Sequence, residues 1–209
     1  MLLRGVTYQG PPIEDPSKLQ GLPHALIEIL WQVNGFIAYA GGLHVRGLVD
    51  EPEWHSLERY HSGEMALHRL FREVERYDFP FAQDFLGNQF LLRDNLVWRL
   101  RADTGEVSSL DVDLAQFLGA VRDDPIEYLS LHLLASYHQH QGFLEPGHLV
   151  HTMPPLCMKP PEKKLALKAA PAPNVVLFLA DFARQIEDVP DGAKVNLRLF
   201  KPPDGGLVQ

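Results

Sequence analysis

The feature of this sequence that most constrains its fold is a run of short strand-like segments between residues 79 and 110. The segments are rich in aromatic and branched side chains, and the breaks between them hold glycine, asparagine and aspartate. Turns this short join antiparallel neighbours, because a parallel strand needs a crossover of about a dozen residues or more. We therefore expect one continuous antiparallel meander with strands at 79–85, 89–93, 96–101 and 107–110.

Helical periodicity flanks this meander on both sides. Apolar residues at helical spacing predict helices at 22–33, 64–76, 111–121, 125–140 and 176–186, with Asp111 as a helix cap. Further short strands are expected at 3–8, 36–40, 43–47 and 194–200. In the third of these, Leu43 and Val45 alternate with His44 and Arg46, which predicts a half-buried strand. The order predicts an α+β fold, an antiparallel meander sheet flanked by helices with a C-terminal helix-strand extension.

The composition of the chain changes near residue 145. Seven of the 17 prolines lie between Pro146 and Pro173. Proline is excluded from helix interiors and central strands, so this stretch is expected to be an extended, loop-rich connection. At 209 residues the chain holds between one and two domains of roughly 150 residues. We expect a core at 1–145 and a connection with a C-terminal extension at 146–209, packed together as one domain.

Charge divides along the chain as well. Residues 1–145 hold 11 Lys and Arg against 21 Asp and Glu, a net charge of −10, and residues 146–209 hold 8 against 6, or +2. A protein surface this acidic repels phosphates, so the sequence argues against nucleic-acid binding. It favours a basic protein partner, because opposite fields raise encounter rates. The alternative, that the charge only keeps the protein in solution, stays open.

Cysteine usage and hydropathy bear on the compartment. The single cysteine, Cys157, leaves no internal disulfide framework and favours a reducing cytoplasm. The first 12 residues lack a signal-peptide pattern. The most apolar stretch, Val175 to Ala180, is far short of the roughly 20 residues that a membrane helix needs. We expect a cytoplasmic protein that does not contact a membrane.

Two motifs and three later features carry a family resemblance. The first motif is Leu22-Pro23, a helix, and then Val33-Asn34-Gly35-Phe36. The second is Phe81-Ala82-Gln83-Asp84-Phe85-Leu86-Gly87-Asn88-Gln89-Phe90, followed by Val97, by Asp103-Thr104-Gly105-Glu106 and by the segment Leu114–Val121. In this order they resemble the SUKH superfamily, which includes bacterial Syd, yeast cell-wall regulators of the Smi/Knr type and many bacterial immunity proteins. The resemblance covers about residues 20–125.

The resemblance implies a protein-binding module without shared catalytic residues or a cofactor. Many members neutralise a toxin delivered by a neighbouring cell. The leading hypothesis is therefore a non-enzymatic immunity protein whose acidic surface occludes the basic cleft of a toxin domain. The alternative is an intracellular adaptor or regulator that binds a housekeeping partner.

An aromatic segment after Pro52 is the candidate contact surface. It contains Trp54, His55, Tyr60 and His61. Aromatic side chains with polar atoms are enriched at protein interfaces. The competing interpretation is that Trp54 and Tyr60 cover the core.

The sequence also offers candidates for a metal-dependent hydrolase, which is the remote alternative. They are His132, His138, His140, His148, His151 and Cys157. Imidazole and thiolate are good zinc ligands, but His138 and His140 are two residues apart and would point in nearly opposite directions on a helix. Asp84 could be a catalytic carboxylate, yet aspartates in turns usually bond their own backbone. We expect neither a metal nor catalysis.

Overall fold

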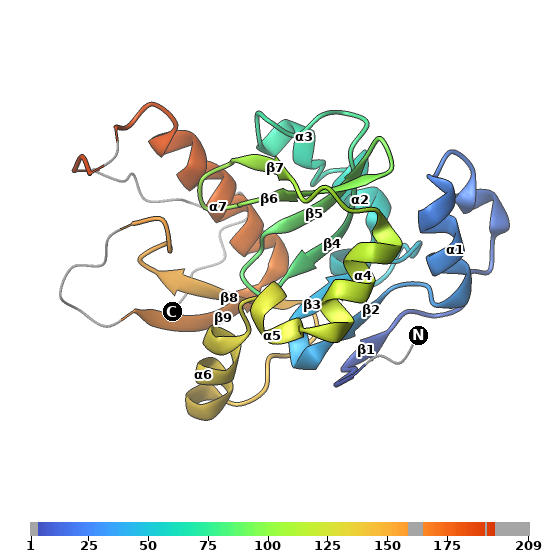
Figure 1. Ribbon diagram of the computed structural model, residues 1–209, viewed down its shortest axis with the longest axis horizontal. Coiled ribbons are helices and arrows are strands. Elements are labelled where there is room, and N and C mark those ends of the chain that lie inside the picture. Colours follow the sequence, from blue (N-terminus) through green and yellow to red (C-terminus); the bar gives the residue numbers. More distant parts are fainter. Residues whose placement is uncertain (1–3, 159–164, 191, 195–209) are drawn as a thin grey trace.

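The computed structural model of this chain describes residues 4–158, 165–190 and 192–194. Seven strands form one sheet in which every neighbouring pair is antiparallel and the spatial order follows the sequence (Figure 1). They are β1 (Tyr8–Gln9), β2 (Phe36–Ala38), β3 (Leu43–Val45), β4 (Phe79–Asp84), β5 (Gln89–Arg93), β6 (Leu96–Leu100) and β7 (Val107–Ser109). The predicted meander and the α+β class are confirmed, and the meander continues through β1 to β3.

Local turn chemistry explains the hairpins. Asp94 and Asn95 join β5 to β6 with φ of 50° and 65°, a left-handed pair that asparagine and aspartate tolerate best among residues with a side chain. Gly87, at φ of 90°, lies in the turn between β4 and β5. A two-residue turn with positive φ at both central positions matches the right-handed twist of the two strands. It therefore fixes the register of the β5–β6 pair.

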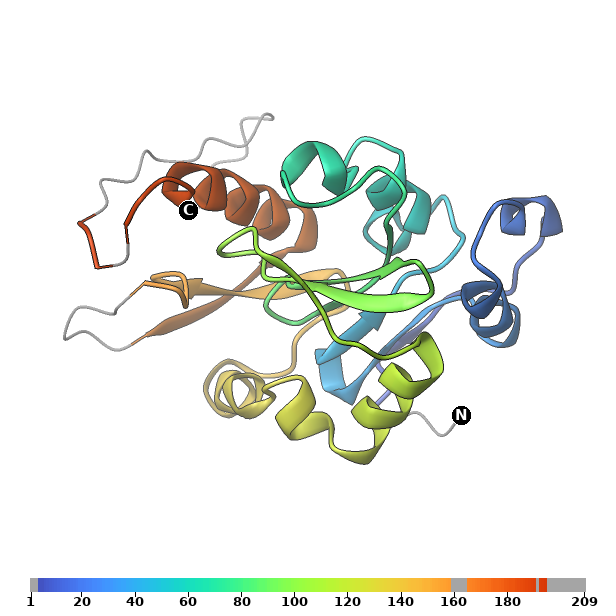
Figure 2. The same cartoon turned by 45° about the horizontal axis from the view of Figure 1, so that its top comes forward.

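Helices cover both faces of the sheet, as Figure 2 shows. The α-helices are α1 (His24–Gln32), α2 (Leu57–His61), α3 (Leu67–Leu70), α4 (Leu114–Asp123), α5 (Pro125–Tyr128), α6 (His132–Gln141) and α7 (Ala172–Ile186). Short 3₁₀ helices are η1 (Pro16–Leu19), η2 (Tyr39–Gly41) and η3 (Glu53–His55). No helix among the described residues has the length and apolar composition needed to cross a membrane.

Alternating side chains of the sheet point into two apolar cores, one on each face. Phe90 and Leu92 face α1 and α4 and join one buried cluster with Phe117. Leu91 and Leu100 belong to a second cluster, together with residues of α2, α3 and α7. Because α7 shares this second cluster with the sheet, α7 packs directly on the core.

Several helix boundaries differ from the predicted ones. The predicted helix at 64–76 is wrong, because only α3 is helical there and the chain then turns, with Asp78 accepting a hydrogen bond from the backbone of Glu75. The predicted helix at 125–140 is interrupted between α5 and α6, where Ser130 has φ of 54°. The cap of α4 is Asp113 and not Asp111, since Asp113 forms a capping box with Gln116.

Two segments of the proline-rich stretch form strands where a loop was predicted. It contains a two-stranded antiparallel hairpin of β8 (His148–Met153) and β9 (Ala166–Pro171), and α7 begins four residues before the predicted start. A two-stranded sheet has no central strand, so Pro171 at the end of β9 removes no essential ladder bond. The predicted final strand at 194–200 lies outside the described residues, apart from Lys194.

Candidate functional site

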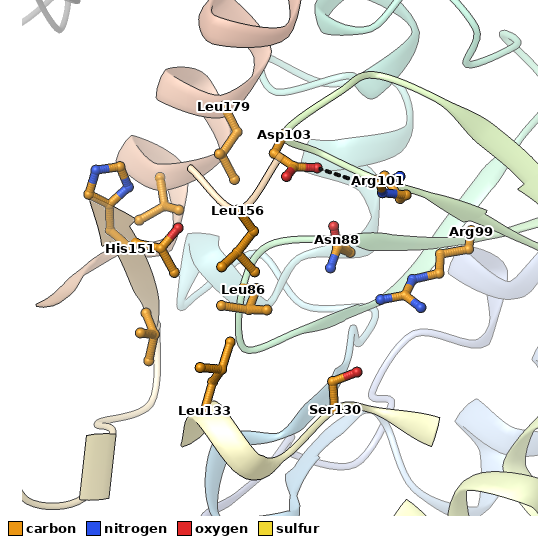
Figure 3. Close-up of a pocket in the computed structure, with 13 residues that line it drawn as sticks. Leu86, Asn88, Arg99, Arg101, Asp103, Ser130, Leu133, His151, Leu156 and Leu179 are labelled. Carbon is orange, nitrogen blue, oxygen red and sulfur yellow. Dashed lines mark ion pairs between the residues drawn. The ribbon is translucent and has the colours of Figure 1, made fainter. Parts of the chain in front are cut away.

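A cavity of about 290 Å³ opens where one end of the large sheet meets the segment between α5 and α6, α6 itself, β8 and α7 (Figure 3). It brings together residues that are far apart in the sequence. The lining consists of Leu86, Asn88, Arg99, Arg101, Asp103, Ser130, Leu133, Val150, His151, Thr152, Leu156, Val175 and Leu179. The cavity is therefore a mixed site, with an apolar wall and several polar side chains converging on it.

One wall is the turn between β4 and β5, which the side chain of Asp84 organises. This carboxylate is 1% exposed and accepts hydrogen bonds from the backbone of Leu86 at 2.9 Å and of Asn88 at 3.0 Å. It also accepts one from Asn88 Nδ2 at 2.8 Å. Burial raises the pKa of the Asp84 carboxyl group, and the positive charge of Arg99 opposes that rise. Asp84 thus stabilises the turn that it begins, which is a structural role rather than that of a free base.

Arg99 of β6 is the cation nearest to this carboxylate, but the two groups do not form a close pair. Arg99 Nη2 lies 3.6 Å from Asp84 Oδ2, beyond the usual hydrogen-bond distance. Within the described part of the chain, Arg99 Nε is shielded from solvent and has no hydrogen-bond partner. A shielded donor without a partner costs about 1–3 kcal/mol of stability. The wall of the cavity therefore carries an incompletely satisfied guanidinium group.

Arg101 and Asp103 line another part of the cavity, and Cys157 contacts Asp103 beside it. Arg101 Nη2 lies 3.8 Å from Asp103 Oδ1 (Figure 3). Asp103 Oδ2 also accepts a hydrogen bond from the Cys157 backbone at 2.9 Å. Burial and the negative charge of Asp103 raise the pKa of the Cys157 thiol to about 12. The thiol is therefore protonated at neutral pH, which makes it a poor nucleophile and a poor metal ligand.

Comparison with known proteins gives the fold and no more. No protein-family model and no curated protein matches this chain. The structure is similar to the crystal structure of Atu4351 from Agrobacterium tumefaciens, with a TM-score of 0.50 and 8% sequence identity over 84% of this chain and 85% of that one. At this identity the likeness shows a shared fold alone, so the resemblance to the SUKH superfamily stays a prediction.

A second polar cluster lies inside the protein, and the sequence pattern did not reveal it. His44 and Arg46 were expected on the outer face of a half-buried strand, but they are 4% and 0% exposed. Arg46 donates hydrogen bonds to Pro80 O at 2.7 Å, to Gln83 Oε1 at 2.8 Å and to Gln89 Oε1 at 2.6 Å. Its guanidinium also stacks over a tyrosine ring at 4.0 Å. The strand is buried on both faces because helices cover both sides of the sheet at this point.

The predicted contact residues divide into buried and partly exposed ones. His55 and Tyr60 are 0% exposed, and the Tyr60 ring is the one beneath Arg46. Trp54 is partly exposed and lies edge-on to His55, while partly exposed His61 stacks on Phe79 at 4.4 Å. A binding surface in this segment therefore has to use Trp54 and His61, because His55 and Tyr60 offer no surface to a partner.

The candidate metal ligands are dispersed. His138 contacts Phe143, His140 bonds the backbone of its own helix at Ser136 O, and His151 lies edge-on to Phe178. His132 is exposed and His148 is partly buried on β8. Over the described ranges, no three His, Cys, Asp or Glu side chains are grouped to hold a metal ion.

We expect the purified protein to contain no stoichiometric zinc, because the histidines are dispersed and the thiol of Cys157 is protonated. Elemental analysis of protein prepared without an affinity tag measures this. Zinc that survives purification and is lost when His138 and His140 are both changed to Ala would contradict the expectation. His24→Ala, an exposed histidine on α1, is the matched control.

Proposed function

We propose that this chain is a non-catalytic protein-binding module, an immunity protein that neutralises a cognate bacterial toxin by covering its active site. The proposal combines the resemblance to the SUKH superfamily with one feature of the surface. That feature, the acidic segment 50–64, carries the argument for a basic partner and for the face that meets it.

The acidic segment has five carboxylates and one arginine, a net charge of −4 from these groups. All five carboxylate residues are exposed; they are Asp50, Glu51, Glu53, Glu58 and Glu64. Arg59 pairs with two of them and Lys18 with a third, whereas Glu51 and Glu58 take part in no ion pair within the described ranges. Exposed carboxylates without a close cation leave a negative field that attracts a basic surface.

Trp54 and His61 give this segment an apolar element. Trp54 lies edge-on to Tyr8 at 4.9 Å and packs against the backbone of Gly147, so its ring is held in place by two distant parts of the chain. An aromatic side chain that is already ordered loses little entropy when a partner covers it. An ordered tryptophan within an acidic segment of the sequence suits a partner with basic and apolar groups, such as the cleft of a nuclease toxin.

The test is binding to the product of the adjacent gene, which should be a toxin if the proposal is right. We expect Glu51→Lys with Glu58→Lys to slow association about tenfold at low salt, because the two variants reverse the charge that attracts the partner. The effect should shrink as salt rises, since the Debye length is about 10 Å at 0.1 M salt. Stopped-flow association rates across a salt series measure both expectations.

Glu127→Lys with Asp188→Lys is the matched control. Both residues are exposed and lie outside the acidic segment, and the pair changes the net charge by the same amount. An equal slowing by the two double variants would contradict the choice of surface. If the neighbouring gene product does not bind, or if the protein does not protect cells from it, the immunity proposal fails.

A further inference from the structure

The cavity in Figure 3 combines an apolar wall with a cation whose hydrogen-bonding capacity is unused. Six of its 13 lining residues are leucine or valine, contributed by the β4–β5 turn, α6, β8, the segment after β8, and α7. In Figure 3 the Arg99 side chain extends from β6 toward the space between Asn88 and Ser130. Ligand sites in proteins commonly have this form, a mostly apolar cavity with a few placed polar groups.

Arg99 is available to a ligand because Asp84 cannot satisfy it. The oxygens of Asp84 already accept three hydrogen bonds from the turn that contains Leu86 and Asn88. Those bonds hold the carboxylate 3.6 Å from the guanidinium. Across the described residues Arg99 donates no hydrogen bond, whereas a guanidinium has five N–H donors in a fork that matches a carboxylate.

The charges around the cavity select a singly charged anion. Among the lining residues Arg99 and Arg101 are positive and Asp103 is negative, so the lining carries 2 − 1 = +1, and Asp84 and Glu106 lie behind it as further carboxylates beside the two arginines. Arg101 lies near two carboxylates, at 3.8 Å from Asp103 and 3.5 Å from Glu106, whereas Arg99 has Asp84 at 3.6 Å and donates no hydrogen bond among the described residues. A dianionic phosphate would exceed the single positive charge of this lining, whereas a carboxylate adds one negative charge and can bind Arg99 in a bidentate manner.

We propose that this cavity binds a ligand with one carboxylate attached to a branched aliphatic group. The carboxylate lies on the guanidinium of Arg99, and the aliphatic group packs against Leu86, Leu133 and Leu156. The proposal goes beyond toxin binding and does not depend on it, because the cavity and the acidic segment share no residues. The same chemistry is offered by a free branched-chain acid and by the C-terminal leucine of a protein.

The experiment is a titration of the ¹⁵N-labelled protein with 4-methylpentanoate, followed through the Arg99 Nε–H signal and the leucine methyl signals. We expect both sets of signals to shift and saturate together. The neutral isostere 4-methylpentanamide should bind at least about tenfold more weakly, because it lacks the charge that pairs with Arg99. Equal shifts with the acid and the amide, or no shift with either, would overturn the proposal.

Two variants locate the site. Arg99→Gln removes the anchor and is expected to abolish carboxylate binding, whereas Arg122→Gln, an arginine exposed on α4, should leave it unchanged. Because Arg99→Gln leaves Asp84 without its nearest cation and could unfold the protein, Leu156→Trp provides an independent test. Leu156 is 44% exposed, so the larger ring can be accommodated while it fills the cavity and blocks the ligand. Unchanged binding by folded Leu156→Trp would contradict the location.

A second ligand distinguishes the two sources. N-acetyl-leucine presents the carboxylate and the aliphatic group as a chain terminus does. Tighter binding of N-acetyl-leucine than of 4-methylpentanoate supports the proposal and assigns the ligand to a protein C-terminus. The reverse order supports the proposal and assigns it to a free acid.

Discussion

Gly35→Ala is expected to lower the free energy of unfolding by about 3 kcal/mol or more. Gly35 follows α1 with φ of 75°, a region that residues with a Cβ rarely adopt. A Cβ at this position would lie 2.5 Å from His55 Cε1 and 2.6 Å from the backbone nitrogen of Gly47. That nitrogen donates to His55 O at 2.9 Å, so neither neighbour can move without breaking other contacts.

Urea denaturation of the variant measures the loss, and Gly21→Ala separates its two causes. Gly21 has a similar φ of 81°, but nothing lies within 4 Å of the position of a Cβ there. Gly21→Ala should therefore cost only the backbone strain, about 1 kcal/mol. Equal losses in the two variants would show that the close packing around Gly35 contributes nothing.

The large sheet could be predicted because the information for it is local. Each hairpin from β4 to β7 is joined by a short turn, and Asp94-Asn95 adopts the left-handed conformation that these residues favour. Alternation along the strands then sets which side chains point inward. Prediction failed at 64–76, because the apolar spacing of Leu67, Phe71 and Val74 is met by one helical turn followed by a bend.

The buried polar cluster could not be predicted from alternation alone. His44 and Arg46 alternate with Leu43 and Val45. Such alternation usually predicts that the polar side chains face solvent. In this fold the polar set meets its partner Gln83 on β4 of the same sheet, under a helical cover. Only knowledge of which strand pairs with β3 would have revealed that these polar residues satisfy one another.

The cavity escaped sequence reasoning for a related reason. Its cationic wall comes from β6, but its apolar wall comes from α6, β8 and α7. The prolines around β8 and β9 argued for a loop, and a loop would have left Arg99 facing open solvent. Tertiary packing of the hairpin on the sheet creates the site, and no local pattern encodes that packing.

Acidification from pH 7 to pH 5 is expected to destabilise the protein strongly. Burial lowers the pKa of His55 from 6.5 to about 4, and burial also lowers the pKa of His44 well below 6.5. Below pH 6.5 the unfolded chain binds protons that the folded chain cannot, so stability present above that pH is lost as pH falls toward the folded pKa. For His55 alone the loss at pH 5 is about 2 kcal/mol, and His44 adds to it.

The hydrogen bonds of this pair explain why neither ring accepts a proton. His55 Nε2 donates to Asn34 O at 3.1 Å, so Nδ1 of the neutral ring is an acceptor. His44 Nε2 donates to that Nδ1 at 2.8 Å, and His44 Nδ1 accepts from Gln83 Nε2 at 3.1 Å. Gln83 cannot reverse its amide, because its Oε1 accepts from Arg46 at 2.8 Å. Arg46 therefore fixes the donor-to-acceptor direction of this whole series of hydrogen bonds. A second proton, on Nδ1 of either imidazole, would place two hydrogen-bond donors face to face.

Urea denaturation between pH 7 and pH 5 measures the loss, in a window above the ordinary pKa values of most carboxylates. His24→Gln, on the exposed face of α1, is the matched control, because it removes a histidine and leaves the buried His44–His55 pair intact. Long-range ¹⁵N spectra of the folded protein should show both buried rings protonated at Nε2 only. If the His44 or His55 signal titrates near pH 6.5 in the folded state, the directed chain from Arg46 to Asn34 is wrong. The acid lability would then need a different cause.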